Sequence, residues 1–187
     1  MTVAPTLSRA EIVSIARRTK SLMHREEMEY LCQLAERAPD GDGLEIGVYM
    51  GASLIAWGLT RQGRGRVMGI DDWSYRDIPN LQTKCRAALE QANVEAQLFD
   101  MAIAVASALI PGPLSFLFVD GDHTRKFVEE DIRLWTPKVK TGGVIAFHDY
   151  GRHKNGCAVT EAVDAWRDVL RWKYIGTVVT TIGFEKQ

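Results

Sequence analysis

The sequence has few cysteines, and none of them form close pairs. Cys32, Cys85 and Cys157 lie far apart, and no C-x-x-C motif occurs. This spacing argues against a disulfide framework and against a structural zinc site, because both need clustered thiols. Unpaired thiols are typical of a reducing compartment, so we predict a cytoplasmic protein.

The chain also has almost no net charge, with 23 Lys plus Arg against 24 Asp plus Glu. Balanced charge gives no overall field that would attract nucleic acid or an acidic membrane. The first residues lack a basic region followed by an apolar run, so no signal peptide is expected. The uncharged stretch 101–119 raises the question of a membrane span, but Pro111-Gly112-Pro113 interrupts it, and we predict a short helix and a buried strand there. The sequence thus predicts no nucleic-acid partner and no membrane association.

The dinucleotide fingerprint G-x-G-x-x-G is absent, although a related glycine turn is present. Residues 44–53, L-E-I-G-V-Y-M-G-A-S, combine an apolar strand, a turn with Gly47 and Gly51, and the start of a helix. Glycine lets the backbone approach a ligand at the positive end of a helix. Glu45 suits a cationic ligand such as S-adenosylmethionine better than a pyrophosphate, which it would repel. Taken alone, the turn fits a methyltransferase or another nucleotide binder equally well, and Glu45 is alternatively a helix-dipole partner.

Apolar strands alternate with helical segments through the rest of the chain. The strands are predicted at 44–48, 67–70, 94–99, 114–119 and 144–147, with two short ones near 174–179 and 182–184. This alternation predicts an α/β fold with a doubly wound, mostly parallel, Rossmann-like seven-stranded sheet. Residues 1–40 read as an N-terminal helical extension whose first helix starts with a capping box of Ser8 and Glu11, and 41–187 as the α/β domain. The extension is a candidate to cap a site or to pair two subunits in a homodimer.

Polar side chains occur where each apolar strand stops. They are Glu45, beside Gly47 of the glycine turn, then Asp71, Asp100, Asp120, and His148 with Asp149. Asp71 is placed to accept hydrogen bonds from ribose hydroxyls, with Asp72 a close second choice. Asp100 is placed to accept a hydrogen bond from the adenine amino group or, equally, to cap the next helix. The basic segment 61–66 falls at the start of a strand, on the side away from a site at the strand ends.

The fourth and fifth strands bring acidic and imidazole groups together if they are neighbours in the sheet. Asp120 and Asp149 could then reach one ion. Without a cation such a cluster would repel or shift its pKa values, whereas a divalent metal makes it favourable. Carboxylates favour Mg²⁺ or Ca²⁺, and an imidazole ligand moves the preference toward Mn²⁺ or Fe²⁺. The alternative is that Asp122 and Asp149 are turn or cap residues and His148 a core histidine, but the residues as a set favour a site.

A resemblance to a known family is carried by three segments, L-E-I-G-V-Y-M-G-A-S, F-V-D-G-D-H-T and D-I-R-L-W-T-P-K-V-K-T-G-G-V-I-A-F-H-D-Y. They resemble class I S-adenosylmethionine-dependent methyltransferases, in the small-molecule branch of macrolide sugar O-methyltransferases and cephalosporin-hydroxylase-like proteins and, more distantly, catechol and caffeoyl-CoA O-methyltransferases. The similarity runs from about residue 42 to 184. Metal-dependent members have an Asp after the fourth strand and an Asp-Asn or Asp-Asp pair after the fifth. By position this implies Asp120, His148 and Asp149 as metal ligands, and the histidine is the departure from that pattern that leaves metal dependence open.

The resemblance implies methyl transfer from S-adenosylmethionine to a hydroxyl of a small-molecule acceptor, with or without Mg²⁺ or another divalent metal. The implied cofactor-binding residues are Glu45, Gly47, Gly51, Asp71, Asp100 and Asp120. The candidate catalytic residues are Asp120, His123 and His148, and either histidine could take the hydroxyl proton. Candidates for the acceptor wall are Trp73, Tyr75, Tyr150 and the loop 152–154.

Two other classes of protein stay open. An NAD-type Rossmann dehydrogenase would share the fold and Asp71, but it should show the missing glycine fingerprint. A non-catalytic nucleotide-binding module would keep the fold without turnover.

Overall fold

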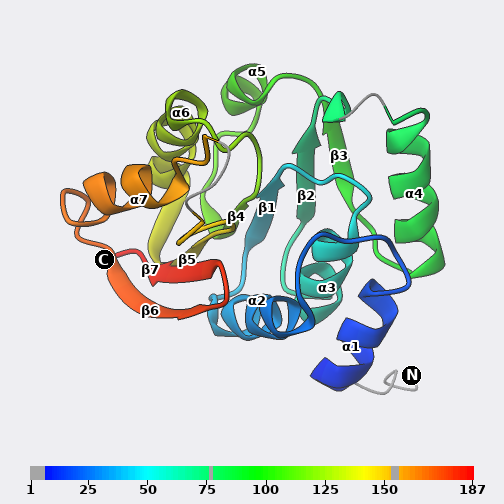
Figure 1. Cartoon of the computed structure of the whole chain (residues 1–187). Helices are drawn as coiled ribbons and strands as arrows, with labels where there is room; N and C mark the ends of the chain where they lie inside the picture. The colour runs from blue at the N-terminus through cyan, green and yellow to red at the C-terminus, as the bar shows by residue number, and fades with distance from the viewer. Residues whose placement is uncertain (1–6, 76–77, 153–155) are drawn as a thin grey trace.

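One sheet organises the protein, whose computed structural model describes residues 7–75, 78–152 and 156–187. Within these residues the strand order is β3-β2-β1-β4-β5-β7-β6 (Figure 1). The strands are β1 (Asp42–Ile46), β2 (Val67–Asp71), β3 (Gln97–Asp100), β4 (Leu114–Val119), β5 (Val139–Phe147), β6 (Lys173–Val178) and β7 (Thr181–Glu185). The first five are parallel, and β7 runs antiparallel between β5 and β6. This confirms the predicted seven-stranded, mostly parallel sheet.

The strand order reverses direction between β1 and β4. From β1 the chain moves outward to β2 and β3, then returns to place β4 on the other side of β1, where Ile46 pairs with Val119. All six residues of β4 are buried, as expected for a central parallel strand covered on both faces. Because the strands are parallel, β1, β2, β4 and β5 end at one edge, called here the carboxyl edge. Ligands of such sheets bind outside this edge, at the reversal point.

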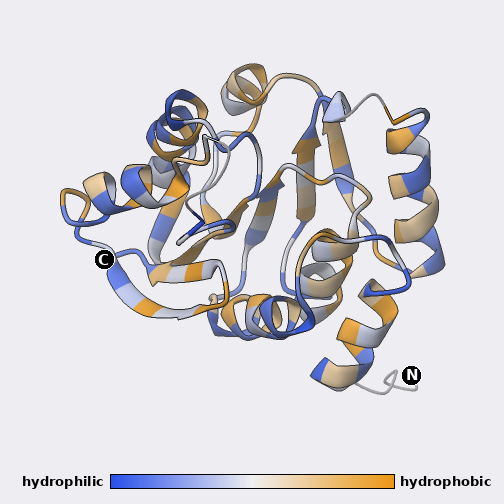
Figure 2. Cartoon of the chain, in the orientation of Figure 1, coloured by the Kyte–Doolittle hydropathy of each residue, from blue (hydrophilic) through white to orange (hydrophobic). Residues whose placement is uncertain are grey.

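Helices cover both faces of the sheet (Figure 1). The helices α1 (Arg9–Ala16), α2 (Arg25–Arg37), α3 (Ala52–Thr60) and α4 (Leu81–Gln91) build one apolar layer. The helices α5 (Ile103–Leu109), α6 (Arg125–Trp135) and α7 (Val159–Arg167) build the other, and a short 3-10 turn (Thr136–Lys138) follows α6. Polar residues colour the outer sides of the helices, whereas the strands are largely apolar (Figure 2). No described helix is long and apolar enough to cross a membrane.

The two N-terminal helices pack on α3. Ser8 caps α1, and its capping box with Glu11 is present as predicted. On α2, the buried residues Met28, Leu31 and Leu34 join the same core cluster as α3. The division into an extension and a domain, and a homodimer formed through these helices, stay predictions.

The basic segment 61–66 lies at the amino ends of the strands, away from the carboxyl edge, as predicted. Within this segment Arg61 is buried, with an exposed fraction of only 2%. Its guanidinium donates to the backbone carbonyls of Ala35 and Ala38 at the end of α2. Terminal helix carbonyls lack partners within the helix, so Arg61 joins α2 to the sheet by satisfying them. Burial lowers the pKa of Arg61 to about 10.

Some predicted boundaries were wrong by a few residues. The strand predicted at 94–99 begins at Gln97 and includes Asp100. The helix α4 begins at Leu81, since Asn80 before it has a left-handed φ of 57°. The first strand ends at Ile46 rather than at residue 48, since Gly47 turns the chain with a φ of +83°.

Candidate functional site

Residues that follow four different strands meet at the carboxyl edge. Gly47, after β1, lies directly against the backbone of Asp120, after β4: a Cβ added to Gly47 would be 2.1 Å from the Asp120 carbonyl oxygen. The backbone N–H of Asp120 donates to the Ile46 carbonyl at 2.8 Å, and that of His148 donates to the Val119 carbonyl at 3.0 Å. Main-chain bonds of the sheet therefore fix where these side chains begin.

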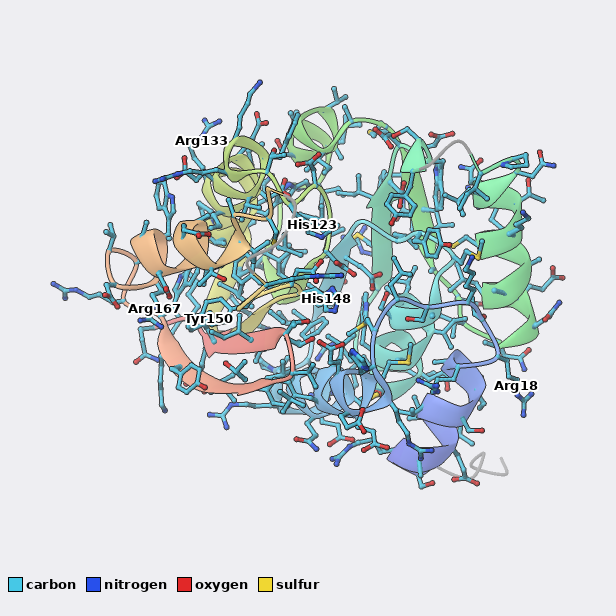
Figure 3. All side chains as sticks on the ribbon, in the orientation of Figure 1. Arg18, His123, Arg133, His148, Tyr150 and Arg167 are labelled. Carbon is cyan, nitrogen blue, oxygen red and sulfur yellow. The ribbon has the colours of Figure 1, made fainter. Side chains whose placement is uncertain are left out.

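Two aspartates and two histidines at this edge form a connected group. We call Asp120, His123, His148 and Asp149 the carboxylate–histidine cluster. Asp120 Oδ1 lies 3.0 Å from His148 Nδ1 and 3.7 Å from His123 Nε2. His123 Nε2 lies 2.9 Å from Asp149 Oδ2. Figure 3 shows the two histidines near each other in the middle of the view, while Arg18 and Arg133 lie at the periphery.

The charges of the cluster stabilise one another. Burial alone would raise the pKa of Asp120 and Asp149, but the neighbouring histidines outweigh it and hold both pKa values below the usual range. Arg152 contributes to this, since its Nη1 donates to Asp149 Oδ1 at 2.6 Å. In return, the Asp120 and Asp149 carboxylates raise the pKa of His123 to about 10. Both aspartates are therefore anionic at neutral pH.

His148 is held by carboxylates on both sides of its ring. Its Nδ1 faces Asp120, and its Nε2 lies 3.4 Å from Oε1 of Glu27, on α2. Burial lowers the pKa of His148, but the Asp120 charge and the hydrogen bonds to both carboxylates raise it to about 11. With Nδ1 directed at Asp120 and Nε2 at Glu27, His148 has no ring nitrogen left for a metal or for the proton of an acceptor. The geometry thus favours neither role that was predicted for His148.

Three residues of the cluster fit a divalent metal. Ligand atoms of Asp120, His123 and Asp149 lie within 4.8 Å of one another, the one such grouping found in the described part of the chain. His123 Nε2 is buried and, although close to two carboxylates, makes no hydrogen bond of good geometry. Two carboxylates and an imidazole are suitable ligands for Mn²⁺, Fe²⁺ or Mg²⁺. The set differs from the predicted one in that His123 takes the place of His148.

Asp71 anchors the glycine turn. Its Oδ2 accepts from the backbone N–H groups of Val48 and Tyr49, both at 2.8 Å, and its Oδ1 accepts from Trp73 N at 2.7 Å. Burial raises the pKa of Asp71 and outweighs the lowering effect of these three backbone hydrogen bonds. A carboxylate has about four acceptor positions, so one remains for a ligand such as a ribose hydroxyl. Asp72, the second choice for that role, is exposed and, among the described residues, accepts only from Ser74.

Glu45 points into the protein instead of toward a ligand. It is fully buried, and its two oxygens accept from Ser53 Oγ at 2.5 Å and Trp57 Nε1 at 2.6 Å, both on α3. Burial raises the pKa of Glu45 to about 8. Glu45 thus ties α3 to β1 beneath the turn, and direct contact with a cofactor is not supported by this placement.

The remaining predicted residues lie around the edge. Asp100 is exposed at the end of β3, where Gln82 Nε2 donates to it at 3.3 Å. Tyr75 packs edge-on against Tyr49 of the glycine turn, with ring centroids 5.3 Å apart. Tyr150 donates to Asp164 at 2.9 Å. Of the loop predicted as an acceptor wall, residues 153–154 lie outside the described residues.

Three of the seven described non-glycine residues with left-handed φ values lie at this edge. Tyr49, Trp73 and Asp149, which follow β1, β2 and β5, have left-handed φ values of 53°, 59° and 59°. Such values are uncommon for residues other than glycine and cost of order 1 kcal/mol or more each. They persist where surrounding bonds impose them, as the Asp71 carboxylate does for Tyr49 and Trp73.

A buried carboxyl below the cluster allows a test of stability against pH. Asp131, on α6, is 2% exposed, and its Oδ2 makes no hydrogen bond to any residue that the structure describes. Burial, then the charges of Glu130 and Asp122, raise its pKa to about 7. The unfolded chain loses this proton near pH 4, so the folded state is progressively destabilised as pH rises from about 4 to 7. The side chain of Asp131→Asn does not ionise. We therefore expect the unfolding free energy of this variant, relative to that of the native protein, to rise by about 2 kcal/mol from pH 5 to pH 8.

Urea denaturation of Asp131→Asn and the native protein at the two pH values measures this difference. The control is Glu129→Gln, which removes one charge from the partly exposed side of the same helix. An equal stability difference at pH 5 and pH 8 would contradict the raised pKa.

Comparison with known proteins gives a consistent picture. A family model described as a methyltransferase domain matches residues 44–150. Among solved structures, the O-methyltransferase NovP is 17% identical with a TM-score of 0.72, over 89% of this chain and 82% of that one. An O-methyltransferase from Bacillus cereus in complex with SAH is 15% identical with a TM-score of 0.68, over 95% and 89%. TomG from Streptomyces achromogenes, an O-methyltransferase involved in tomaymycin synthesis and solved with SAM, is 16% identical with a TM-score of 0.65, over 96% and 89%. At these identities the structures establish a shared fold.

Proposed function

The chain belongs to the methyltransferase-domain family, whose model covers more than half of its 187 residues, and from that premise we propose that it methylates a hydroxyl of a small molecule with S-adenosylmethionine. The observation that carries the proposal is that a glycine turn held by Asp71 and the carboxylate–histidine cluster adjoin each other at one edge. The turn is suited to a nucleoside and the cluster to a hydroxyl. Similar folds include O-methyltransferases solved with SAM or SAH. We also infer a cytoplasmic location, since all three cysteines are free.

The turn and Asp71 are assigned to the cofactor. Gly47 and Gly51 have no side chain, so the backbone before α3 is open to a ligand at these two positions. The backbone of Asp120 crowds Gly47, and Gly51 has a left-handed φ of +88°, so neither position suits another residue. The remaining acceptor position of Asp71 suits a ribose hydroxyl. Asp100, exposed at the end of the neighbouring strand β3, is assigned to the adenine amino group.

The cluster is assigned to the acceptor. When bound, S-adenosylmethionine supplies the methyl group: the acceptor oxygen forms the C–O bond as the C–S bond breaks, the electron pair stays on sulfur, and the hydroxyl proton leaves. We assign that proton to Asp120 Oδ2, which accepts no hydrogen bond from any described residue. Asp149 is the poorer base, since it is 4% exposed and paired with Arg152. Holding donor and acceptor in line provides much of the rate acceleration in such reactions.

Asp120, His123 and Asp149 are also the residues that would hold a divalent metal. Such an ion would supply Lewis-acid stabilisation that lowers the pKa of the acceptor hydroxyl. The chain supplies two anionic oxygens and His123 Nε2, which makes no hydrogen bond of good geometry and would release its proton when an ion binds, so the residues present fit an ion.

The proposed function is tested by calorimetric titration with S-adenosylhomocysteine and with NAD⁺, followed by transfer of tritiated methyl groups to a panel of hydroxylated small molecules. We expect S-adenosylhomocysteine to bind and NAD⁺ not to bind, and at least one acceptor to be labelled. Binding of NAD⁺ in its place would favour a dehydrogenase. Binding without transfer to any acceptor would favour a non-catalytic module.

The assignment of Asp71 predicts a loss of cofactor affinity. We expect Asp71→Asn to bind S-adenosylhomocysteine about 10- to 100-fold more weakly, because an amide nitrogen cannot accept from the turn or from a ribose hydroxyl. Calorimetry on Asp71→Asn and on Asp72→Asn measures it, the latter being the matched control one residue away. Unchanged affinity in the first variant, or a loss confined to the second, would show that the ribose does not bind at Asp71.

A further inference from the structure

We propose that Glu27 of the N-terminal helix α2 is a positioning residue of the site, which acts through His148 to fix the orientation of Asp120. The side chain of Glu27 is 1% exposed. Burying a carboxylate is costly unless its charge and its lone pairs are satisfied. Its partners therefore show which contacts the burial serves.

A structural role accounts for one of the two carboxylate oxygens. Oε2 accepts from the backbone N–H of His24 at 2.8 Å, which completes a capping box at the start of α2. The capping box needs only this one oxygen of Glu27. In Glu27 the second oxygen is directed inward, across the carboxyl edge.

Oε1 joins α2 to two distant parts of the chain. It accepts from Thr180 N at 2.9 Å and from Thr180 Oγ1 at 2.6 Å, in the turn between β6 and β7. It also lies 3.4 Å from His148 Nε2, and Thr180 Oγ1 lies 3.4 Å from the same nitrogen. These bonds outweigh the effect of burial and lower the pKa of Glu27 to about 2. Glu27 is thus a fixed negative charge beside His148.

Fixing one nitrogen of His148 fixes the other. The ring is 6% exposed, and with Nε2 directed at Glu27 its Nδ1 is directed at Asp120 Oδ1, at 3.0 Å. This occupies the inner oxygen of Asp120 and leaves Oδ2 for the acceptor. The contact from Glu27 to His148 is thus continued by the contact from His148 to Asp120, one of the three residues that fit a metal.

Glu27→Gln is the variant that tests this role. Glutamine keeps the length of the side chain and one oxygen for the cap, but it carries no charge to hold His148. Glu26→Gln is the matched control, because Glu26 is exposed on the same turn of α2. Thermal melting and the affinity for S-adenosylhomocysteine establish that each variant is folded. Glu27→Asp is a second variant, which keeps the charge and withdraws the oxygen from His148.

Two measurements go beyond folding. In ¹⁵N-histidine-labelled protein, with signals assigned by His148→Asn, we expect the slowly exchanging Nε2–H of His148 in the native protein to exchange rapidly in Glu27→Gln and in Glu27→Asp. By electron paramagnetic resonance, we expect Mn²⁺ to bind Glu27→Gln about tenfold more weakly, a size typical of residues that orient metal ligands. Affinity for S-adenosylhomocysteine should stay within about twofold of the native value in all variants.

The outcomes separate this role from the proposed function. Unchanged His148 exchange in the folded Glu27 variants would overturn the proposal and leave Glu27 as a helix cap. A native protein that binds neither S-adenosylhomocysteine nor Mn²⁺ would instead count against the proposed function, while the His148 exchange still decides whether Glu27 holds the ring.

Discussion

Replacing Asp120 by asparagine is expected to lower the rate of methyl transfer by about 10²- to 10⁴-fold, the range typical for loss of a general base. The amide neither accepts the hydroxyl proton nor offers an anionic oxygen to a metal. The fold should persist, because Asp120 is joined to β1 through its backbone N–H, which donates to the Ile46 carbonyl at 2.8 Å. Asn has the same shape as Asp, so cofactor affinity should change much less than the rate.

Rates of tritium transfer to the best acceptor of the panel, together with calorimetric affinity for S-adenosylhomocysteine, separate the two effects. Asp122→Asn is the matched control: Asp122 lies in the same loop but is exposed, and its side chain accepts from Thr124 N at 2.7 Å. Its rate should stay within about twofold of the native value. If Asp120→Asn transferred methyl groups as fast as this control, the chemistry would not occur at the carboxylate–histidine cluster.

The sequence was sufficient to predict that Asp120 and Asp149 share an edge. Asp120 directly follows one apolar strand and Asp149 comes two residues after another, and parallel strands end on the same side of a sheet. The side chains of such residues need only local structure to reach one another once β4 and β5 pair, as Val119 does with Phe147. The same reasoning placed Asp71 beside the glycine turn, although the backbone bonds that it accepts from Val48 and Tyr49 were not foreseen.

Glu45 shows where a signal in the sequence was overlooked. Side chains alternate between the two faces of a strand. Leu44 and Ile46 pack in the core layer with α5, α6 and α7, so Glu45 has to point into the opposite layer, where Ser53 and Trp57 of α3 receive it. The strand period alone was enough to predict a buried carboxyl here.

The roles of the two histidines and of Glu27 could not be predicted in the same way. His123 and His148 both follow strands, and which nitrogen of which ring stays free depends on side-chain directions that no local pattern encodes. Glu27 reaches Thr180 across 153 positions of sequence. That contact exists only because α2 packs against the sheet, so it is a property of the tertiary structure.

Gly47 is a position of the glycine turn where a single added methyl group should have a large effect on folding. A Cβ at this residue would lie 2.1 Å from the carbonyl oxygen of Asp120 and 2.9 Å from Gly121 Cα. These are backbone atoms, so no side-chain rotation relieves the collision. The backbone is held in place as well, since Gly47 N donates to the Ile70 carbonyl and Asp120 N donates to the Ile46 carbonyl.

We expect Gly47→Ala to lose more than about 4 kcal/mol of unfolding free energy, because overpacking against fixed backbone adds to the strain of a left-handed residue. Typical domains have about 5–15 kcal/mol in total, so the variant should unfold at low urea or accumulate in the insoluble fraction. Gly63→Ala is the matched control: its φ of +80° is nearly that of Gly47, at +83°, but a Cβ there meets nothing within 4 Å. It should lose only about 1 kcal/mol. Equal urea midpoints for the two variants would mean that the glycine turn and the loop after β4 are not in contact. Because that contact joins the turn to the carboxylate–histidine cluster, the site would then have to lie elsewhere.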